Sequence, residues 1–298
     1  MSLVAILIAN PARPAITDAV LAETRRVLRT DHQPRTLHGE VAAELLVPGD
    51  PADAPALSRR LRAAFAAEPF DVAVLPAGPH RRKRLFLADM DSTMIEQECI
   101  DELADTIGLR AEVSAITERA MRGDIAFGPA LRERVALLRG MPVSVVDTLI
   151  AERISLMPGA RTLVQTLKAH GTHTCLVSGG FTLLTGPVAE RIGFDEAHAT
   201  TLEVAEGRLT GAVREPIVDK AMKRATLTTL RSRFGLDRAE TLAVGDGAND
   251  LDMIGEAGLG VAFRAKPAVA AAAQVRIDHG DLTALLYLQG YAASEFVN

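Results

Sequence analysis

Residues 85–93 have the sequence LFLADMDST, in which a short apolar run leads directly into two carboxylates. The apolar residues predict a buried strand, and Asp89 and Asp91 follow where that strand ends. Two carboxylates at this spacing can share a site, one as a nucleophile and the other as an acid and base toward a leaving oxygen. Because a phosphate dianion repels carboxylates, this chemistry needs a divalent cation, and oxygen ligands favour Mg2+. The alternative is a solvated turn without chemistry.

The chain after residue 158 alternates between helical and strand-like segments. A helix is expected over residues 161–169, and strands are expected at residues 173–177, 241–244, 261–263 and 275–277. This alternation predicts an α/β fold with a doubly wound parallel sheet and helices on both faces. Ligands of such sheets bind at the carboxyl ends of the strands, so the motifs that follow strands are the candidates for chemistry.

Two of these candidates could bind an anion. Ser178 and Gly179 belong to a Ser-Gly-Gly sequence that follows the strand at 173–177, where a hydroxyl and free backbone amides would form a cradle. Lys223 opens the predicted helix 223–234 and could neutralise a phosphate together with the nucleophile. Lys220 competes for that role, and a lone lysine is usually a solvated surface charge.

A fourth motif, GDGAND at residues 245–250, follows the strand at 241–244. Its glycines are expected to permit a tight turn with positive φ. Asp246 can complete the metal site, while Asn249 and Asp250 can hold the ligands in place. Independent turns rarely line up in one order behind strands, so the set favours one shared site.

The order Asp-x-Asp-x-Thr, Ser-Gly-Gly, Lys, Gly-Asp-x-x-x-Asp resembles the haloacid dehalogenase (HAD) superfamily over residues 84–298. Dehalogenases of that superfamily generally lack the second aspartate of the first motif, so Asp91 points to phosphoryl transfer. The segment 94–157, which is helical in character, resembles the small helical cap of the phosphoserine phosphatase family. The resemblance implies that Glu98 binds the substrate ammonium, that Arg134 grips the carboxylate, and that Met121 and Phe127 form apolar pocket walls.

The resemblance also implies a reaction, the hydrolysis of O-phospho-L-serine to L-serine and phosphate, which is the last step of serine biosynthesis. Phosphate would lie against Mg2+, Ser178, Gly179, Lys223 and Asn249, and the metal would be held by three ligands: Asp89, Asp246 and the backbone carbonyl of Asp91. Asp89 would form an aspartyl-phosphate intermediate.

Residues 1–76 follow the order strand, helix, strand, strand, helix, strand, with no cluster of reactive groups. This order predicts a ferredoxin-like α+β domain, and it resembles an ACT-type regulatory module. Modules of that type often pair edge to edge, so a homodimer is the expected assembly. Residues 77–84, with two prolines nearby and a basic run, are expected to be a solvated linker before the phosphatase domain at 85–298.

The overall composition excludes several classes of function. The formal net charge of −5 leaves no basic surplus for nucleic acid, and no apolar run is long enough to cross a bilayer. Cys99 and Cys175 are isolated, which fits a reducing cytoplasm and two small buried side chains. Three alternatives stay open: transfer of phosphate to another alcohol such as homoserine, hydrolysis of a different small phosphate, and an amino-acid-sensing regulatory protein.

Overall fold

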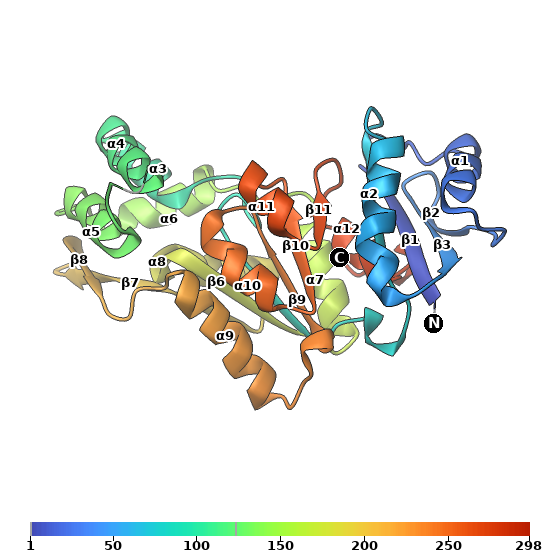
Figure 1. Cartoon of the computed structure of the whole chain (residues 1–298). Coiled ribbons are helices and arrows are strands. Elements are labelled where there is room, and N and C mark those ends of the chain that lie inside the picture. The colour runs from blue at the N-terminus through green and yellow to red at the C-terminus, as the bar shows by residue number, and fades with distance from the viewer. Residues whose placement is uncertain (1, 123) are drawn as a thin grey trace.

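The computed structural model describes residues 2–122 and 124–298 and contains two β-sheets (Figure 1). The first sheet is antiparallel and has the strand order β2-β3-β1-β4, with two helices on one face, as expected for a ferredoxin-like domain. Its elements are β1 (Ser2–Ala9), α1 (Asp18–Leu28), β2 (Arg35–His38), β3 (Ala42–Pro48), α2 (Ala54–Ala64) and β4 (Phe70–Pro76).

Strand β1 is buried on both faces, which explains its unbroken apolar sequence. Leu3, Ala5 and Leu7 pack in the core beneath α1 and α2. Val4, Ile6 and Ile8 point the other way, because successive strand residues alternate between faces, and they join the core that contains Tyr287 and its neighbours in α12 (Ala284–Leu288). The C-terminal helix therefore covers the second face of the N-terminal sheet.

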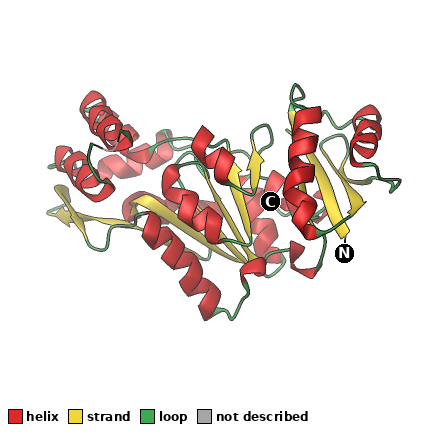
Figure 2. Cartoon of the chain, viewed as in Figure 1, coloured by secondary structure: helices red, strands yellow, loops and turns green. Residues whose placement is uncertain are grey.

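The second sheet has seven strands in the order β11-β10-β9-β5-β6-β7-β8. Figure 2 shows the strands of this sheet in yellow among red helices. All neighbouring pairs are parallel except β7 and β8, which form an antiparallel hairpin that the sequence analysis did not predict. The strands are β5 (Leu85–Ala88), β6 (His173–Phe181), β7 (Glu196–Ala205), β8 (Arg208–Arg214), β9 (Thr241–Gly245), β10 (Leu259–Phe263) and β11 (Val275–Ile277).

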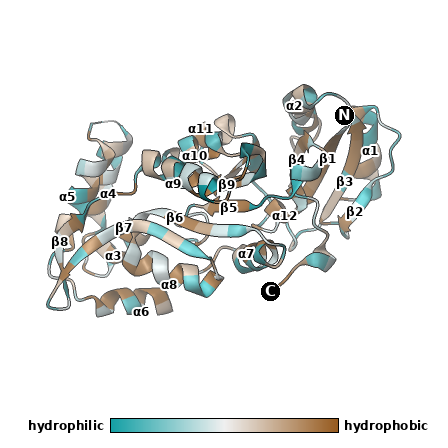
Figure 3. Ribbon diagram, turned by 90° about the horizontal axis from the view of Figure 1, so that it is seen from below, coloured by the Kyte–Doolittle hydropathy of each residue, from teal (hydrophilic) through white to brown (hydrophobic). Residues whose placement is uncertain are grey.

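Helices cover both faces of this sheet, so the doubly wound architecture is confirmed. Phe86 and Ala88 of β5 face the core of α7 (Ala160–Ala169) and α8 (Thr182–Ile192). Leu85 and Leu87 face α9 (Lys220–Arg233) and α10 (Leu251–Glu256). Figure 3 shows β1 and β5 in the brown of hydrophobic residues. The short helix α11 (Pro267–Ala272) follows β10.

The expected helical cap is present between β5 and α7. It consists of α3 (Cys99–Asp105), α4 (Arg110–Met121), α5 (Phe127–Leu137) and α6 (Ser144–Glu152). The hairpin β7–β8 reaches out from the sheet and packs against α5 (Figure 1). The two chain segments that connect the cap to the core lie side by side, since Met157 N donates to Met94 O at 2.9 Å.

The expectation of a solvated linker at residues 77–84 is wrong for two of its basic residues. Arg81 is largely buried, pairs with Glu44 at 2.6 Å and donates to the carbonyls of Tyr287 and Leu288. Lys83 donates to the carbonyls of His80 and Ala239, both at 2.7 Å. These cations satisfy carbonyl groups at the junction of the two sheets, so the segment is tied down.

Two smaller expectations concern the cysteines and membrane spans. Cys99 and Cys175 are both buried and form no disulfide. Within residues 2–122 and 124–298, none of the helices has both the length and the hydrophobicity that a bilayer crossing requires.

Candidate active site

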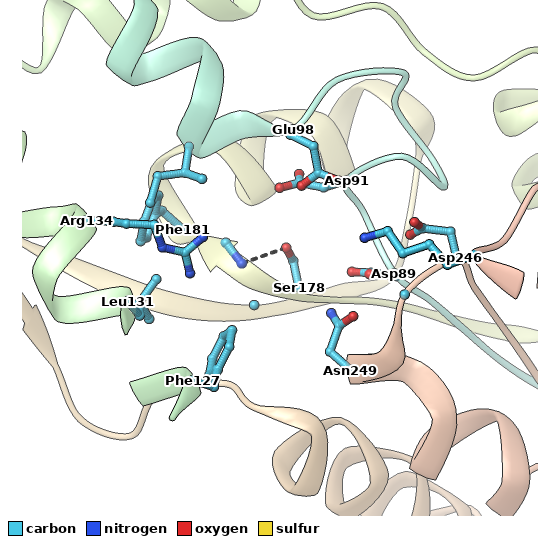
Figure 4. Close-up of a pocket in the computed structure, with 15 residues that line it drawn as sticks. Asp89, Asp91, Glu98, Phe127, Leu131, Arg134, Ser178, Phe181, Asp246 and Asn249 are labelled. Atoms are coloured by element: carbon cyan, nitrogen blue, oxygen red, sulfur yellow. Dashed lines mark hydrogen bonds between the residues drawn. The ribbon is translucent and has the colours of Figure 1, made fainter. Parts of the chain in front are cut away.

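The four predicted motifs meet at one edge of the second sheet. Asp89 follows β5, Ser178 lies near the end of β6, and Asp246 follows β9, so the carboxyl ends of three adjacent parallel strands present them together. They line a cavity of about 130 Å³ whose opposite wall comes from the cap (Figure 4). A polar floor and a helical lid therefore enclose one small space.

Asp89 is held firmly in this floor. Its backbone N–H donates to Val244 O at 3.0 Å, which extends the pairing of β5 with β9 by one residue. Its carboxylate Oδ1 accepts from Met90 N at 2.7 Å and pairs with Lys223 Nζ at 2.6 Å. Oδ2 has no hydrogen-bond partner among the described residues. The carboxylate is thus oriented while one oxygen stays open to the cavity.

Lys223 is fully buried between two carboxylates. Its Nζ lies 2.6 Å from Asp89 Oδ1 and 2.8 Å from Asp250 Oδ1. Burial opposes the charged form, but the carboxylates of Asp250 and Asp89 outweigh it and raise the pKa of Lys223 above its ordinary value. The predicted helix starts earlier than expected, at Lys220, because Asp219 caps it by accepting from Met222 N.

The position at which α9 begins determines which of the two lysines reaches Asp89. Lys220 is the first residue of α9 and is exposed, whereas Lys223 lies almost one turn further on and points inward. The structure therefore brings Lys223 to Asp89 and leaves Lys220 at the surface.

The acidic residues form a cluster suited to a cation. Carboxylate oxygens of Asp89, Asp246 and Asp250 lie within 4.8 Å of one another. Burial, together with the negative charges of Asp89 and Glu98, raises the pKa of Asp246 to about 6. Such crowding of buried carboxylates is relieved by a divalent cation with oxygen ligands, so these residues fit a metal ion.

The three carboxylates are not equivalent. Asp250 already accepts from Lys223 Nζ and, through Oδ2, from Gly247 N at 3.1 Å. Among the described residues, the carboxylate of Asp246 accepts only from Thr93 Oγ1, at 3.3 Å. Asp89 and Asp246 are therefore the better metal ligands, and Asp250 orients Lys223 and the loop. A third ligand from the backbone carbonyl of Asp91 stays a prediction.

Asp91 lies in an environment that favours its protonated form. Burial, followed by the charges of Glu98 and Asp89, raises the pKa of Asp91 to about 8. Its Oδ2 accepts from Cys99 N at 3.2 Å, and its Oδ1 is buried without a hydrogen-bond partner in residues 2–122 and 124–298. A carboxyl group that holds a proton near neutral pH can protonate a leaving alkoxide.

The Ser-Gly-Gly motif differs from its expected geometry. It belongs to the end of β6, and α8 begins only at Thr182, so no helix starts at the two glycines. Ser178 is buried and its Oγ accepts from Gly180 N at 2.9 Å (Figure 4). A Cβ on Gly179 would lie 3.4 Å from the ring of Phe127 and from Val218 O, so the glycine keeps this wall of the cavity open.

The glycines of the GDGAND motif also act differently from the prediction, because neither has a positive φ. A Cβ on Gly245 would lie 2.3 Å from the carboxyl carbon of Asp250. A Cβ on Gly247 would lie 2.3 Å from Oδ1 of Asn249, which lines the cavity. Their small size, and not their backbone freedom, lets the two side chains fold back over the loop.

The cap supplies the opposite wall. Phe127, Leu131 and Arg134 of α5 all face the cavity because their spacing of four and three residues places them on one side of a helix (Figure 4). Arg134 donates to Thr117 Oγ1 at 3.2 Å and forms no ion pair with the described acidic residues. Its guanidinium is thus available to an anion. The side chain of Met121, the other predicted wall residue, lies outside the described part of the structure.

Glu98 reaches the cavity from the loop before α3. Its Oε1 accepts from Ser92 Oγ at 2.8 Å. Burial raises the pKa of Glu98, while the hydroxyl of Ser92 and the ammonium of Lys266 oppose that shift. Arg134 lies at the end of the cavity away from Asp246, and Glu98 lies beside Asp91, so the cavity has one positive and one further negative group on its walls (Figure 4).

Four lining residues were not predicted from the sequence. Ile100, Leu131 and Phe181 add apolar surface, and Lys266 adds a cation after β10. Leu131 could have been found from its helical spacing to Phe127 and Arg134. Lys266 follows a predicted strand at 261–263, so the rule that placed the other motifs would also have included it. Its backbone N–H donates to Asp246 O at 3.1 Å.

Comparison with known proteins agrees with this geometry. The family model of haloacid dehalogenase-like hydrolases matches residues 86–255, which include the core motifs and the cap. The chain belongs to this family. A phosphoserine phosphatase from Streptomyces coelicolor is 48% identical over 240 residues, covering 79% of this chain. The chain spans only 58% of the length of that relative.

Solved structures of related hydrolases extend the likeness to the whole fold. A HAD family hydrolase from Salmonella enterica has a TM-score of 0.85 and 30% identity, covering 96% of this chain and 98% of its own. A structure described as a phospho-aspartyl intermediate analogue of phosphoserine phosphatase has a TM-score of 0.64 and 39% identity, covering 69% of this chain and 98% of its own. The N-terminal sheet thus also has a counterpart in a haloacid dehalogenase-like hydrolase.

Proposed function

We propose that the protein is a phosphoserine phosphatase, a phosphomonoester hydrolase that releases phosphate from O-phospho-L-serine. The observation that carries this proposal is the charge pattern of one small cavity. Asp89 and Asp91 lie at the floor, while Glu98 provides a carboxylate and Arg134 a guanidinium without an ion pair to the described acidic residues, for the two charges of an amino acid. The similarity to proteins named phosphoserine phosphatase supports the same substrate.

In the proposed reaction, Asp89 attacks phosphorus, the bond from phosphorus to the serine oxygen breaks, and Asp91 gives its proton to that oxygen. Asp91 then takes a proton from water, which attacks the aspartyl-phosphate and releases phosphate and free Asp89. Lys223 fixes the nucleophile, and Ser178, Gly179 and Asn249 contact the phosphate oxygens. Mg2+, bound by Asp89 and Asp246, would offset the negative charge of phosphate during both steps.

The remaining assignments belong to the same proposal. Residues 1–76 form an ACT-like regulatory domain, 77–84 connect it to the phosphatase domain at 85–298, and 94–157 form the cap. The cap opens to admit substrate and closes to exclude water. The proposal also includes a homodimer that forms through the N-terminal domain and a location in the cytoplasm. Buried, unpaired Cys99 and Cys175 support a reducing compartment.

The test is phosphate release from L-phosphoserine, with Mg2+ and with a chelator, beside a panel of other phosphomonoesters. We expect strong preference for phosphoserine and loss of activity with the chelator. Release from other esters but not from phosphoserine would contradict the substrate and keep the chemistry. Formation of a new phosphoester when homoserine is added would favour phosphotransfer over hydrolysis.

A further inference from the structure

The loop between the two catalytic motif residues and the cap folds back on itself. Ser92 N donates to Gln97 O at 3.2 Å, and Cys99 N donates to Asp91 Oδ2 at 3.2 Å. The first bond joins two backbone groups and the second joins a backbone group to a side chain. Together they hold the beginning and the end of the loop side by side. The position of Glu98 is therefore tied to the backbone that carries Asp91.

Ser92 occupies an unusual backbone conformation in this loop. Its φ is +53°, in the left-handed region that residues other than glycine, asparagine and aspartate seldom adopt. This conformation is strained for a residue with a Cβ and persists only where the surroundings enforce it. Here it turns the Ser92 hydroxyl toward Glu98, whose Oε1 accepts from it at 2.8 Å.

Glu98 is a flexible side chain among several charged groups. The side chain has three rotatable bonds, and it shares the cavity with the like charges of Asp89 and Asp246 and with the ammonium of Lys266. The Ser92 hydroxyl holds Oε1, while Oε2 has no hydrogen-bond partner among the described residues. One carboxylate oxygen is thus fixed and the other is left for a ligand.

We propose that Ser92 is a positioning residue that sets the selectivity of the site for substrates with an ammonium group. Its hydroxyl orients Glu98 so that the second carboxylate oxygen meets the ammonium. Ser92 does not line the cavity, so it acts through Glu98 and does not touch the substrate. The inference rests on the proposed function, since Glu98 has an ammonium to bind only if the substrate is phosphoserine or a close analogue.

The experiment compares Ser92→Ala and Ser92→Gly with the natural protein on two substrates. One is L-phosphoserine, and the other is 3-phosphooxypropionate, which is phosphoserine without its amino group. We expect kcat/KM for phosphoserine to fall about tenfold more than for the analogue, mainly through KM, because a hydroxyl bound to a carboxylate is lost. Glycine adopts positive φ freely, so equal effects of the two variants would assign the loss to the hydroxyl.

Two controls separate this inference from its alternatives. Glu98→Gln should reduce the same selectivity, and adding Ser92→Ala to it should change little further, because both act on one contact. Equal losses on both substrates, no loss on either, or recovery in Ser92→Gly would each overturn the role of the hydroxyl. If the natural protein itself fails to hydrolyse phosphoserine with Mg2+, the proposed function fails, and this is visible before any variant is made.

Discussion

At the scale of single residues, the site is organised around one buried ammonium. Lys223 lies between Asp89 and Asp250 and has no exposed surface, and in the described part of the chain those two carboxylates are its only ion-pair partners. Removing one member of such a buried group leaves unpaired charges, which is strongly destabilising. In the proposed reaction the same ammonium acts on the phosphate that Asp89 attacks, so Lys223 should matter for both stability and catalysis.

Lys223→Met should reduce kcat/KM for phosphoserine by about 10²–10³-fold, because a preorganised positive charge at the reacting phosphate is lost. It should also lower the free energy of unfolding by about 3–5 kcal/mol, since two buried carboxylates lose their partner. Lys220→Met is the matched control and should change neither quantity, because Lys220 is exposed. Steady-state kinetics and urea unfolding measure both effects, and a larger loss in the control would reverse the assignment.

Asp91→Asn tests the general acid. The variant should reduce kcat for phosphoserine by about 10²–10⁴-fold, and the loss should be smaller for p-nitrophenyl phosphate, whose leaving group needs no proton. The pKa of Asp91 is raised to about 8, so the acid is protonated below that pH and activity falls as the pH rises through it. A bound cation stabilises the carboxylate, so the alkaline fall should lie at or below pH 8.

The pH profile of kcat/KM provides the decisive comparison for this residue. The natural protein should show the alkaline fall, and Asp91→Asn should lack it because the amide does not titrate in that range. An unchanged alkaline fall in the variant, or equal losses on both substrates, would show that another group protonates the leaving oxygen.

At the scale of elements, strands with local signals could be predicted and the hairpin β7–β8 was missed. Residues 85–88 are apolar and end in Asp89, so their sequence alone identified a strand end. The sequence offered only one local signal for this hairpin, the glycine at position 207 in a polar stretch between Leu202 and Leu209. In the structure Glu206 and Gly207, both with positive φ, form the two-residue turn that joins β7 to β8. The cap contacts of this hairpin are long-range, and no local pattern predicts them.

The close approach of side chains to the glycines of the GDGAND motif likewise could not be predicted from the motif alone. The glycines at 245 and 247 were expected to provide positive φ, yet their role depends on how Asn249 and Asp250 fold back over them. The sequence already preferred Lys223 over Lys220, but the geometric reason, the start of α9 at Lys220 behind the Asp219 cap, came only from the structure. Side-chain placement of this kind depends on tertiary contacts, and these are absent from a sequence pattern.

Helix α5 permits a test of substrate recognition by the cap. Arg134→Ala should reduce kcat/KM for phosphoserine by roughly 10–100-fold, because a charged hydrogen bond to the carboxylate is worth about 1.5–3 kcal/mol. Phosphoethanolamine lacks that carboxylate and should be affected much less. Arg132→Ala on the same helix is the matched control, since Arg132 is exposed and pairs with Glu215. An equal loss on both substrates would show that Arg134 supports the cap and does not bind the carboxylate.

At the scale of the whole molecule, the N-terminal sheet is joined to the HAD core by a buried carboxylate. Asp71 of β4 accepts from the backbone N–H groups of Asp278, His279 and Gly280, at 2.8–3.3 Å. We call this interface between the N-terminal sheet and the core the seam. It also contains α12, whose Tyr287 hydroxyl lies 2.6 Å from Nδ1 of His38. Apolar packing of β1 on α12 and these polar contacts act together, so the two sheets should unfold cooperatively.

Asp71→Asn should reveal how much this junction contributes to the stability of the protein. The amide keeps the size of the side chain but replaces one acceptor oxygen with a donor that faces backbone N–H groups. We expect the free energy of unfolding to fall by about 2–3 kcal/mol, because a buried charged acceptor serves several donors and its loss leaves some of them unsatisfied. Asp31→Asn, at an exposed position on the same sheet domain, is the control and should change stability by less than about 0.5 kcal/mol.

Urea unfolding of Asp71→Asn should show a single cooperative transition at a lower midpoint than that of the natural protein. Unchanged stability in Asp71→Asn, or two separate transitions in the natural protein, would show that the sheets are stabilised independently and that the seam is not a structural coupling.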